Sequence, residues 1–448
     1  MKHKTTSNIL VLGGGVAGIA ASVKLASAGY RVTLLEKGPR LGGRAYSFYD
    51  AAAGEWVDNC QHILMGCCEA LKELYRLSGS EDKITWQDTY YFFYPNKGFQ
   101  TLKSSCLPAP FQLLPSFLKL DALSFWDRIN ITQLMSSILC QDPEVHPEWA
   151  TLSIKEWFES QGVSRESMRL FWEPVLVSAL NDSIDQLPVS YVFKTIRWGF
   201  LGREGAWKMG IPLVSFHHLY HEQTLNYLTK RNSLVRLKEG VKKLVIQNNR
   251  IAGVLLSDGS YLEADTVISA LPQDKLVPLL DADSCIKKNI SHYKLSPIMG
   301  IHLWLDRRIM ELPNLCLPGN FIQWIFDKTP GEAVSKASSQ YLSIVISASQ
   351  EIMHLPQKEI IDTTLQELKK VFPAAQEACM VHSLIIREPR ATFKLMELQD
   401  SYRLGPVSGI TGLYLAGDWT DTGWPATMES AALSGFAAAR QVINREPF

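Results

Sequence analysis

The first forty residues alternate between short apolar runs and glycine turns. Residues 8–12 are mostly apolar and predict a strand, residues 13–15 are glycines and predict a turn, and residues 16–28 are small and predict a helix. Gly29 ends this helix, and residues 31–36 predict a second strand. The order of strand, turn, helix and strand predicts a βαβ unit at the start of the chain.

The rest of the chain is less regular. From about residue 50 to residue 234 it is rich in aromatic residues and predicts mainly helices. Residues 238–268 predict hairpins, because turn dipeptides at Asn248–Asn249 and Asp258–Gly259 separate apolar or alternating runs. The remaining predicted elements are three strands and two helices, at residues 298–305, 341–347, near 358–371, 412–416 and 427–442.

A chain of 448 residues is too long for one ordinary hydrophobic core, so we expect two domains. The fold class expected is α/β, with a Rossmann-like nucleotide-binding domain assembled from discontinuous segments and a mixed α+β substrate domain. The segments expected in the first domain are residues 1–90, 235–295 and 405–448. Those expected in the second are residues 91–234 and 296–404.

Composition narrows the possible functions. Lys plus Arg equals Asp plus Glu at 45 each, so the chain lacks the basic field that nucleic acid requires, and we expect no nucleic-acid partner. The eight cysteines form no CxxC pair and no Cys/His cluster with metal-ligand spacing, so we expect no metal site. Scattered cysteines of this kind are typical of a reducing compartment, which predicts a cytoplasmic protein.

Two stretches imitate membrane-directed segments. Lys2 and Lys4 precede an apolar stretch, as in a signal peptide, but Lys24 and several glycines interrupt it. Residues 104–118 form the longest uncharged run after Lys103, and prolines at three positions exclude a spanning helix there. Contact with a membrane surface is still compatible with the sequence.

The glycine turn has the spacing of a dinucleotide-binding motif. Gly13 permits a tight turn, Gly15 lets a pyrophosphate approach the backbone, and Gly18 lets the helix pack closely on the strand. Glu36 ends the second strand, where its carboxylate can accept hydrogen bonds from ribose hydroxyls. This carboxylate would repel a 2′-phosphate, so NADP is disfavoured, whereas NAD and FAD fit equally well.

Two further segments indicate which of these two cofactors, NAD or FAD, the chain binds. Residues 41–44 read LGGR directly after the acid, and residues 416–418 read AGD shortly before the block GWPATME at 423–429. This combination resembles the FAD-dependent amine oxidase and phytoene desaturase superfamily. The resemblance implies FAD as cofactor, with the N-terminus of the last helix directed at the flavin. The cofactor-binding residues expected from the motifs and the resemblance are Gly13, Gly15, Val16, Ala17, Gly18, Glu36, Lys37, Gly42, Gly43, Arg44, Gln61, His62, Val241, Gly417, Asp418, Pro425, Ala426, Thr427 and Met428.

Several longer blocks resemble one branch of the superfamily more closely. Residues 57–62 read VDNCQH, residues 171–175 read FWEPV, and residues 422–430 read TGWPATMES. These blocks look like those of the hydroxysqualene dehydroxylases, also called squalene-associated FAD-dependent desaturases. The resemblance implies reductive removal of the hydroxyl group of hydroxysqualene to give squalene. Cys60 stands where that family is expected to have glycine.

The implied reaction needs a proton donor for the departing oxygen. We single out His62, Asp58 and Glu173 as candidate catalytic residues, since a histidine or a buried carboxyl can be protonated near neutral pH. Each has a structural alternative. His62 could be a core histidine, Asp58 could bind backbone or cofactor hydroxyls, and Glu173 could form an ion pair at a helix end.

The same resemblance implies an apolar triterpenoid substrate and an external electron donor, either NAD(P)H or a ferredoxin. The segment 104–126 is rich in Phe and Leu, so we expect peripheral contact with the inner face of the cytoplasmic membrane. The alternative for this segment is an apolar lid packed on the protein's own core. Alternative functions are a carotenoid or squalene-type polyene desaturase, a flavin amine oxidase, and a flavin-binding protein without turnover.

Overall fold

The computed structural model describes residues 8–280, 286, 293–329, 339–395 and 403–445. Its nucleotide-binding sheet has five parallel strands in the order β10-β2-β1-β14-β20. The bounds of these strands are β1 (Ile9–Leu12), β2 (Val32–Glu36), β10 (Leu234–Leu237), β14 (Thr266–Ser269) and β20 (Leu413–Leu415). Three distant parts of the chain therefore build one sheet, which confirms the predicted α/β class and its discontinuous assembly.

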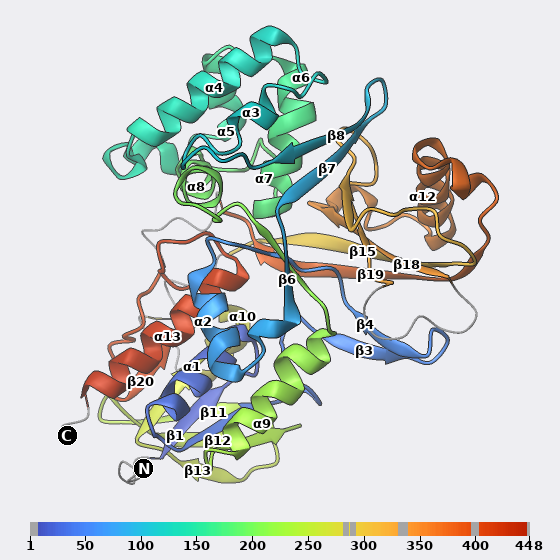
Figure 1. Ribbon diagram of the computed structural model, residues 1–448. Coiled ribbons are helices and arrows are strands. Elements are labelled where there is room, and N and C mark those ends of the chain that lie inside the picture. Colours follow the sequence, from blue (N-terminus) through green and yellow to red (C-terminus); the bar gives the residue numbers. More distant parts are fainter. Residues whose placement is uncertain (1–7, 281–285, 287–292, 330–338, 396–402, 446–448) are drawn as a thin grey trace.

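Two helices from opposite ends of the chain lie side by side against this sheet (Figure 1). They are α1 (Val16–Ser27) and α13 (Met428–Arg445). Their backbones approach closely, because a Cβ added at Gly435 would lie 2.2 Å from the carbonyl oxygen of Ala17. Helix α2 (Glu69–Ser78) packs against both helices, and α9 (Gln223–Thr229) packs against α1.

A small antiparallel meander follows β10. It consists of β11 (Val241–Gln247), β12 (Arg250–Leu256) and β13 (Tyr261–Glu263). Both residues of the first turn, Asn248 and Asn249, have positive φ angles of 49° and 57°, as the expected hairpin turn requires. The predicted hairpin turns are confirmed, although β14 leaves the meander and joins the parallel sheet.

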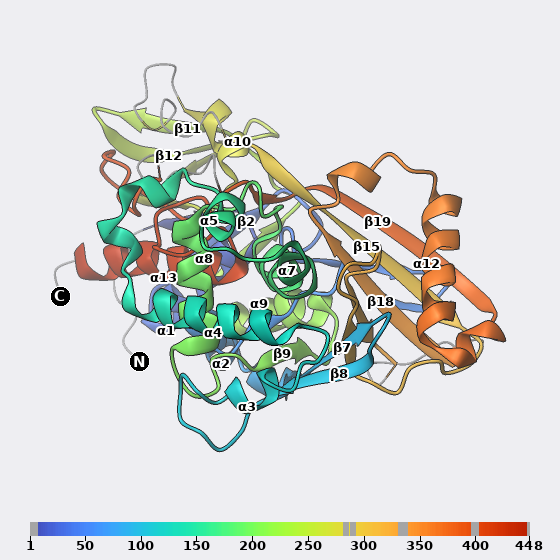
Figure 2. The same cartoon turned by 90° about the horizontal axis from the view of Figure 1, so that it is seen from above.

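The second large sheet has seven strands in the order β19-β15-β18-β17-β16-β7-β8. Their bounds are β7 (Thr89–Tyr94), β8 (Gly98–Lys103), β15 (Leu295–Leu305), β16 (Asn314–Cys316), β17 (Trp324–Asp327), β18 (Gln340–Ser347) and β19 (Met380–Phe393). Helix α12 (Gln357–Val371) buries Ile360 and Leu368 against Ile301 and Ile344 of this sheet. Figure 2 shows α12 on the side of the sheet away from α1 and α13. The predicted strands and helix between residues 296 and 388 are confirmed.

A helical lobe covers the other end of the molecule (Figure 1). Its helices are α3 (Leu114–Phe117), α4 (Phe125–Cys140), α5 (Ile154–Ser160), α6 (Arg165–Ser167), α7 (Glu173–Leu180) and α8 (Val189–Ile196). Three π-helical turns precede α7, follow α8 and precede α9, at Met168–Trp172, Arg197–Leu201 and His217–Glu222. None of the helices within the described ranges is both long enough and apolar enough to cross a bilayer.

The expectation that residues 50–234 are mainly helical is wrong in part. This region also contains strands from β4 to β9, and β7 alternates buried and half-buried residues as a strand does. Five short strands lie in or next to this region: β3 (Ser47–Asp50), β4 (Glu55–Asp58), β5 (Leu64–Met65), β6 (Ile84–Gln87) and β9 (Met209–Pro212). Strands of two to four residues are too short to leave a clear period in the sequence.

The predicted domain boundaries remain a prediction. Helix α9 falls within the range 91–234 expected in the substrate domain, yet it packs against α1 and β10. Parts of the expected ranges, including residues 1–7 and Cys285, lie outside the described residues. A short helix, α10 (Gln273–Leu276), follows β14. Single 3₁₀ turns occur at Glu81–Lys83, Pro143–Val145, Pro147–Ala150, Val277–Leu279, Gln350–Ile352 and Pro373–Gln376.

Candidate flavin site and apolar cavity

The glycine turn between β1 and α1 has the shape of a phosphate cradle. Gly13 has a φ of +99°, and a Cβ added at Gly18 would lie 1.9 Å from the Gly13 carbonyl oxygen, so neither position tolerates a side chain. Gly15 is the N-cap of α1 and has open space in front of it, since an added Cβ would meet only Gly43 Cα, at 3.9 Å. The first turn, with Val16 and Ala17, carries no acidic residue. An anion can therefore approach the helix N-terminus.

The second glycine turn lies directly against the first. The Gly42 N–H donates to the Gly14 carbonyl at 2.8 Å. A Cβ added at Gly43 would lie 2.8 Å from Gly15 Cα. The two motifs that the sequence places about thirty residues apart thus form one surface, and only glycine allows this approach.

Glu36 marks the other end of this surface. Its carboxylate accepts hydrogen bonds from the N–H groups of Gly14 and Gly38, at 2.7 and 2.6 Å. Each oxygen keeps a lone pair for a further donor, such as a ribose hydroxyl. The chain entering β11 runs alongside, because a Cβ added at Gly240 would lie 3.6 Å from Lys37 Cβ. Lys37 and Val241 therefore lie near Glu36.

Arg44 and Asp418 form an ion pair with each other. A guanidinium nitrogen of Arg44 lies 2.5 Å from a carboxylate oxygen of Asp418, and the other donates to the Ala391 carbonyl at 2.9 Å. Asp418 is buried and follows Gly417, whose φ of +141° permits the turn after β20. The two motif residues therefore meet across the site, and their contact with the cofactor stays a prediction.

Arg403 is a site residue that the sequence did not reveal. Its guanidinium is buried and donates to the carbonyls of Asp418 at 3.1 Å, Thr420 at 2.5 Å and Trp424 at 2.7 Å. It therefore fixes the loop between β20 and α13. No motif surrounds this arginine, so its neighbours in the sequence gave no signal of the role.

The last helix begins within one residue of its expected start. Helix α13 starts at Met428, and Pro425 belongs to the loop before it. The hydroxyl oxygen of Thr427 accepts the Ser430 N–H at 3.4 Å and so occupies the position of an N-cap. Ala426 is buried, whereas Pro425, Thr427 and Met428 line a cavity in front of the helix.

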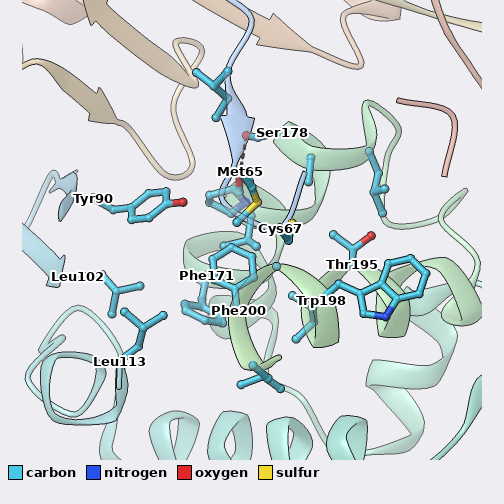
Figure 3. Close-up of a pocket in the computed structure, with 18 of the residues that line it drawn as sticks. Met65, Cys67, Tyr90, Leu102, Leu113, Phe171, Ser178, Thr195, Trp198 and Phe200 are labelled. Carbon is cyan, nitrogen blue, oxygen red and sulfur yellow. Dashed lines mark hydrogen bonds between the residues drawn. The ribbon is translucent and has the colours of Figure 1, made fainter. Parts of the chain in front are cut away.

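This cavity is large and almost wholly apolar. It has a volume of about 360 Å³, and its wall combines residues of the helical lobe, the seven-stranded sheet and the start of α13. Figure 3 shows Phe171, Phe200 and Met65 gathered between Tyr90 and Trp198. Most polar groups on the wall are satisfied by the protein. For example, the Trp324 indole N–H donates to the Ser178 hydroxyl at 2.7 Å.

Of the three candidate catalytic residues, none belongs to the cavity wall as the structure describes it. A ring nitrogen of His62 lies 3.2 Å from the Cys60 carbonyl oxygen, and burial lowers the pKa of this histidine. A lowered pKa favours the neutral ring, which makes it a weaker proton donor near pH 7. Its catalytic role, and its contact with the cofactor, stay predictions.

Asp58 and Glu173 are held elsewhere. Asp58 accepts the Ser47 hydroxyl at 2.7 Å and the Phe216 N–H at 2.9 Å, which is the backbone-binding alternative. Glu173 begins α7 and is half-buried; burial and the nearby Asp185 raise its pKa. Asp58 lies near enough to His62 to oppose the lowering of its pKa by burial. The catalytic roles of Asp58 and Glu173 also stay predictions.

Gln61 and Cys60 lie between β4 and the cavity. Gln61 lines the cavity, and its side-chain oxygen is buried without a partner within the described structure. Such an atom is available to a bound group. Cys60 replaces the expected glycine without backbone strain, since its φ is not positive. Its neighbour across the fold is Gly300, where an added Cβ would lie 3.2 Å from Cys60 Cβ.

Glu429 is a second residue to which the sequence assigned no role. It lies in the first turn of α13 and lines the cavity. Its two carboxylate oxygens accept the N–H groups of Ala70 and Leu71, at 2.8 and 2.9 Å. Burial raises its pKa to about 7, against the two hydrogen bonds, which lower it. The block at residues 422–430 contains Glu429 and carries the resemblance, but the sequence does not show that the carboxyl of Glu429 is buried.

Comparison with known proteins identifies the architecture. Residues 16–443 match the family described as "Flavin containing amine oxidoreductase". The chain belongs to this family. It is therefore a flavin-containing oxidoreductase with FAD as its cofactor. The described residues fit FAD, since the open cradle at Gly15 and the acceptors of Glu36 suit phosphates and a ribose, and the unpartnered oxygen of Gln61 is available in the cavity.

Curated relatives share about a quarter of their residues with the chain. A 15-cis-phytoene desaturase of Capsicum annuum is 26% identical over 467 residues, which cover 97% of this chain and 78% of that protein. A hydroxysqualene dehydroxylase of Sinorhizobium fredii is 24% identical over 446 residues, covering 98% of both. Both similarities span nearly the whole chain.

Solved structures share the fold. An oxidoreductase from Methanosarcina mazei has a TM-score of 0.73 at 20% identity, with 98% of this chain and 100% of that chain covered. A putrescine oxidase bound to putrescine also has a TM-score of 0.73, at 15% identity, with 98% and 99% covered. The fold is therefore that of the amine-oxidase-like flavoproteins.

Proposed function

We propose that the protein reductively removes the hydroxyl group of hydroxysqualene and releases squalene. The observation that carries this proposal is the apolar cavity that ends at the N-terminus of α13. Its wall of aliphatic and aromatic side chains suits a long hydrocarbon better than a charged amine. The similarity to a hydroxysqualene dehydroxylase over 98% of both chains supports the same substrate.

The wall would also favour the chemistry. Loss of the hydroxyl group leaves positive charge on an allylic carbon, and the ring faces of Tyr90, Trp324 and Trp424 on the wall can stabilise such charge. Reduced FAD, when bound, supplies the hydride that neutralises this carbon. An external donor, NAD(P)H or a ferredoxin, returns the electrons. The glycine cradle, Glu36 and the Arg44–Asp418 pair hold the cofactor.

The second candidate is a polyene desaturase, which takes hydride from a hydrocarbon instead of giving it. The similarity to 15-cis-phytoene desaturases favours it, and the same cavity would accept its substrate. The two functions differ in the direction of electron flow, so one experiment separates them.

That experiment follows the flavin absorbance without oxygen. The reduced protein is mixed with hydroxysqualene, and the oxidised protein is mixed in separate samples with phytoene, squalene and putrescine. We expect the flavin to be oxidised by hydroxysqualene, with squalene identified by mass spectrometry. Bleaching of the oxidised flavin by phytoene or squalene would replace the proposal with a desaturase, and bleaching by putrescine with an amine oxidase.

We also propose that the segment 104–126 contacts a membrane from which the substrate enters. The segment has two faces. Phe117 is buried, and Leu113 and Leu114 line the cavity, whereas Phe125 and Trp126 expose 62% and 75% of their surface. The outward face can enter the interface, and the inward face fits the alternative of a lid. We propose that the membrane surface contacted is the inner face of the cytoplasmic membrane.

Vesicle co-sedimentation tests the contact. The double variant Phe125→Glu/Trp126→Glu changes exposed side chains and should reduce binding to phosphatidylglycerol-containing vesicles at least tenfold. Tyr261→Glu, at an exposed aromatic residue of the meander, is the control and should bind like the wild type. Equal binding by the double variant and the wild type would contradict the proposed contact.

A further inference from the structure

The cavity wall contains one group suited to proton transfer. Among the described residues of the wall, Glu429 is the only carboxyl. The other titratable groups there are Cys67, Cys68 and Tyr90. Tyr90 donates its hydroxyl to the Trp207 carbonyl at 2.6 Å, and burial raises its pKa further above neutrality. The described wall therefore offers a substrate oxygen one carboxylic acid.

We infer that Glu429 donates the proton to the oxygen that leaves the substrate. This role rests on the proposed function. The carbon–oxygen bond breaks, the Glu429 proton joins the oxygen, and water departs. Reduced FAD, when bound, would supply the hydride that this carbon needs, which makes the overall change one proton and one hydride. Solvent then returns a proton to Glu429.

The surroundings of Glu429 stabilise both its protonated and its ionised form. Burial favours the neutral acid and brings its pKa to about 7, so a large fraction is protonated near neutral pH. After proton transfer, the carboxylate accepts two N–H groups at the N-terminus of α2, where the helix dipole stabilises negative charge.

Charged and titratable groups surround this carboxyl on several sides. Lys72 of α2 lowers its pKa, and Tyr75 of the same helix interacts with it electrostatically. Cys67 and Cys68 precede α2 and also interact with it, while Arg203 lies close to Cys67. Burial raises the pKa of Tyr75, and the contact between Cys67 and Cys68 raises the pKa of Cys68 and lowers that of Cys67. The carboxyl band of Glu429 in the infrared spectrum separates its ionisation from that of the thiols.

A structural role for Glu429 would be to tie α13 to α2, and the chain offers a matched control for it. Glu367 of α12 accepts the N–H groups of Phe321 and Ile322, at 3.0 and 2.8 Å, far from the cavity wall. Glu367→Gln therefore replaces one of the two accepting oxygens by an NH₂ group without touching the proposed chemistry. Glu429→Gln makes the same change and also removes the acid.

The test compares the wild type with Glu429→Gln and Glu367→Gln, all containing FAD. We expect both variants to keep FAD and to lose similar thermal stability. Only Glu429→Gln should slow flavin oxidation by hydroxysqualene in a single turnover, by about a hundredfold or more. In the wild type and Glu367→Gln this rate should fall as pH rises through about 7.

Infrared spectroscopy of the oxidised proteins gives a readout that does not depend on activity. The C=O band of a protonated carboxyl should disappear with a midpoint near pH 7 in the wild type and in Glu367→Gln, and be missing in Glu429→Gln. An active wild type with an equally active Glu429→Gln, or no such titrating band, would overturn the role of Glu429 alone. A wild type that does not react with hydroxysqualene would overturn the proposed function and this role with it.

Discussion

In the nucleotide-binding region, the residues expected to hold the cofactor belong to a few short stretches of chain. The residues of the cavity wall come from many separate elements, including β7, α4, α7, α8, β17 and the start of α13. Binding in the first region depends on backbone shape, which glycine controls at single positions. Binding in the second region depends on the size and polarity of the side chains that line the cavity. The comparison predicts that single substitutions act more sharply in the first region than in the second.

The sharpest effect is expected at Gly18. A Cβ there would lie 1.9 Å from the Gly13 carbonyl oxygen, so Gly18→Val must push α1 away from β1. We expect a loss of at least about 3 kcal/mol of folding stability and no bound FAD. Gly54→Val is the control, because Gly54 has open space around it and only its φ of +73° opposes a side chain. Flavin absorbance of the purified proteins and thermal unfolding measure both effects; normal FAD content in Gly18→Val would contradict the role of the close approach.

The second-largest effect is expected at Arg403, because its buried guanidinium donates hydrogen bonds to three carbonyl groups. Arg403→Leu leaves these carbonyls without their donors and should cost about 3 kcal/mol in unfolding free energy. It should also weaken FAD binding, since the loop contains Asp418. Urea unfolding and FAD titration measure the two quantities. A stable variant with unchanged FAD affinity would show that the loop holds its shape without this arginine.

Glu429 belongs to α13 of the nucleotide-binding region and also lines the cavity. Its raised pKa predicts that the stability of the protein depends on pH. Its pKa is raised from 4.5 to about 7 in the folded protein, so the folded state binds the proton more tightly than the unfolded state. The stabilisation is complete below about pH 4.5 and is lost as pH rises to about 7, a change of about 3 kcal/mol. Urea unfolding of the wild type and Glu429→Gln across this range measures it. A constant difference between the two proteins would contradict the raised pKa.

Substitutions in the cavity wall should lower turnover of the substrate without lowering stability or FAD content. Ala179 lines the cavity and is only partly buried, so Ala179→Trp should fill the space without unfolding the protein. We expect full FAD content and a turnover of the proposed substrate lowered by about a hundredfold, because a bulky ring displaces the reacting carbon. Ala51→Trp, at an exposed turn, should leave both unchanged. A fully active Ala179→Trp would show that the substrate does not use this part of the cavity.

The sequence by itself was enough to predict a cofactor site at the start of the chain. Gly13, Gly15, Gly18 and Glu36 could be recognised because a tight turn and a phosphate cradle require glycine and an acid at fixed spacing, whatever the rest of the chain does. The hairpin turn at Asn248–Asn249 was readable for the same local reason. The resemblance added FAD and the distant partner, Asp418.

The tertiary structure alone decided which acid faces the cavity. His62, Asp58 and Glu173 were reasonable proton donors by residue type, but protonation depends on burial and on neighbours from other elements. Burial raises the pKa of Glu429, and its carboxylate lies against α2, more than 350 residues earlier in the chain. Arg403 acquires its role from carbonyls of a loop. Such contacts leave no period or spacing in the sequence, because they arise only when distant elements pack together.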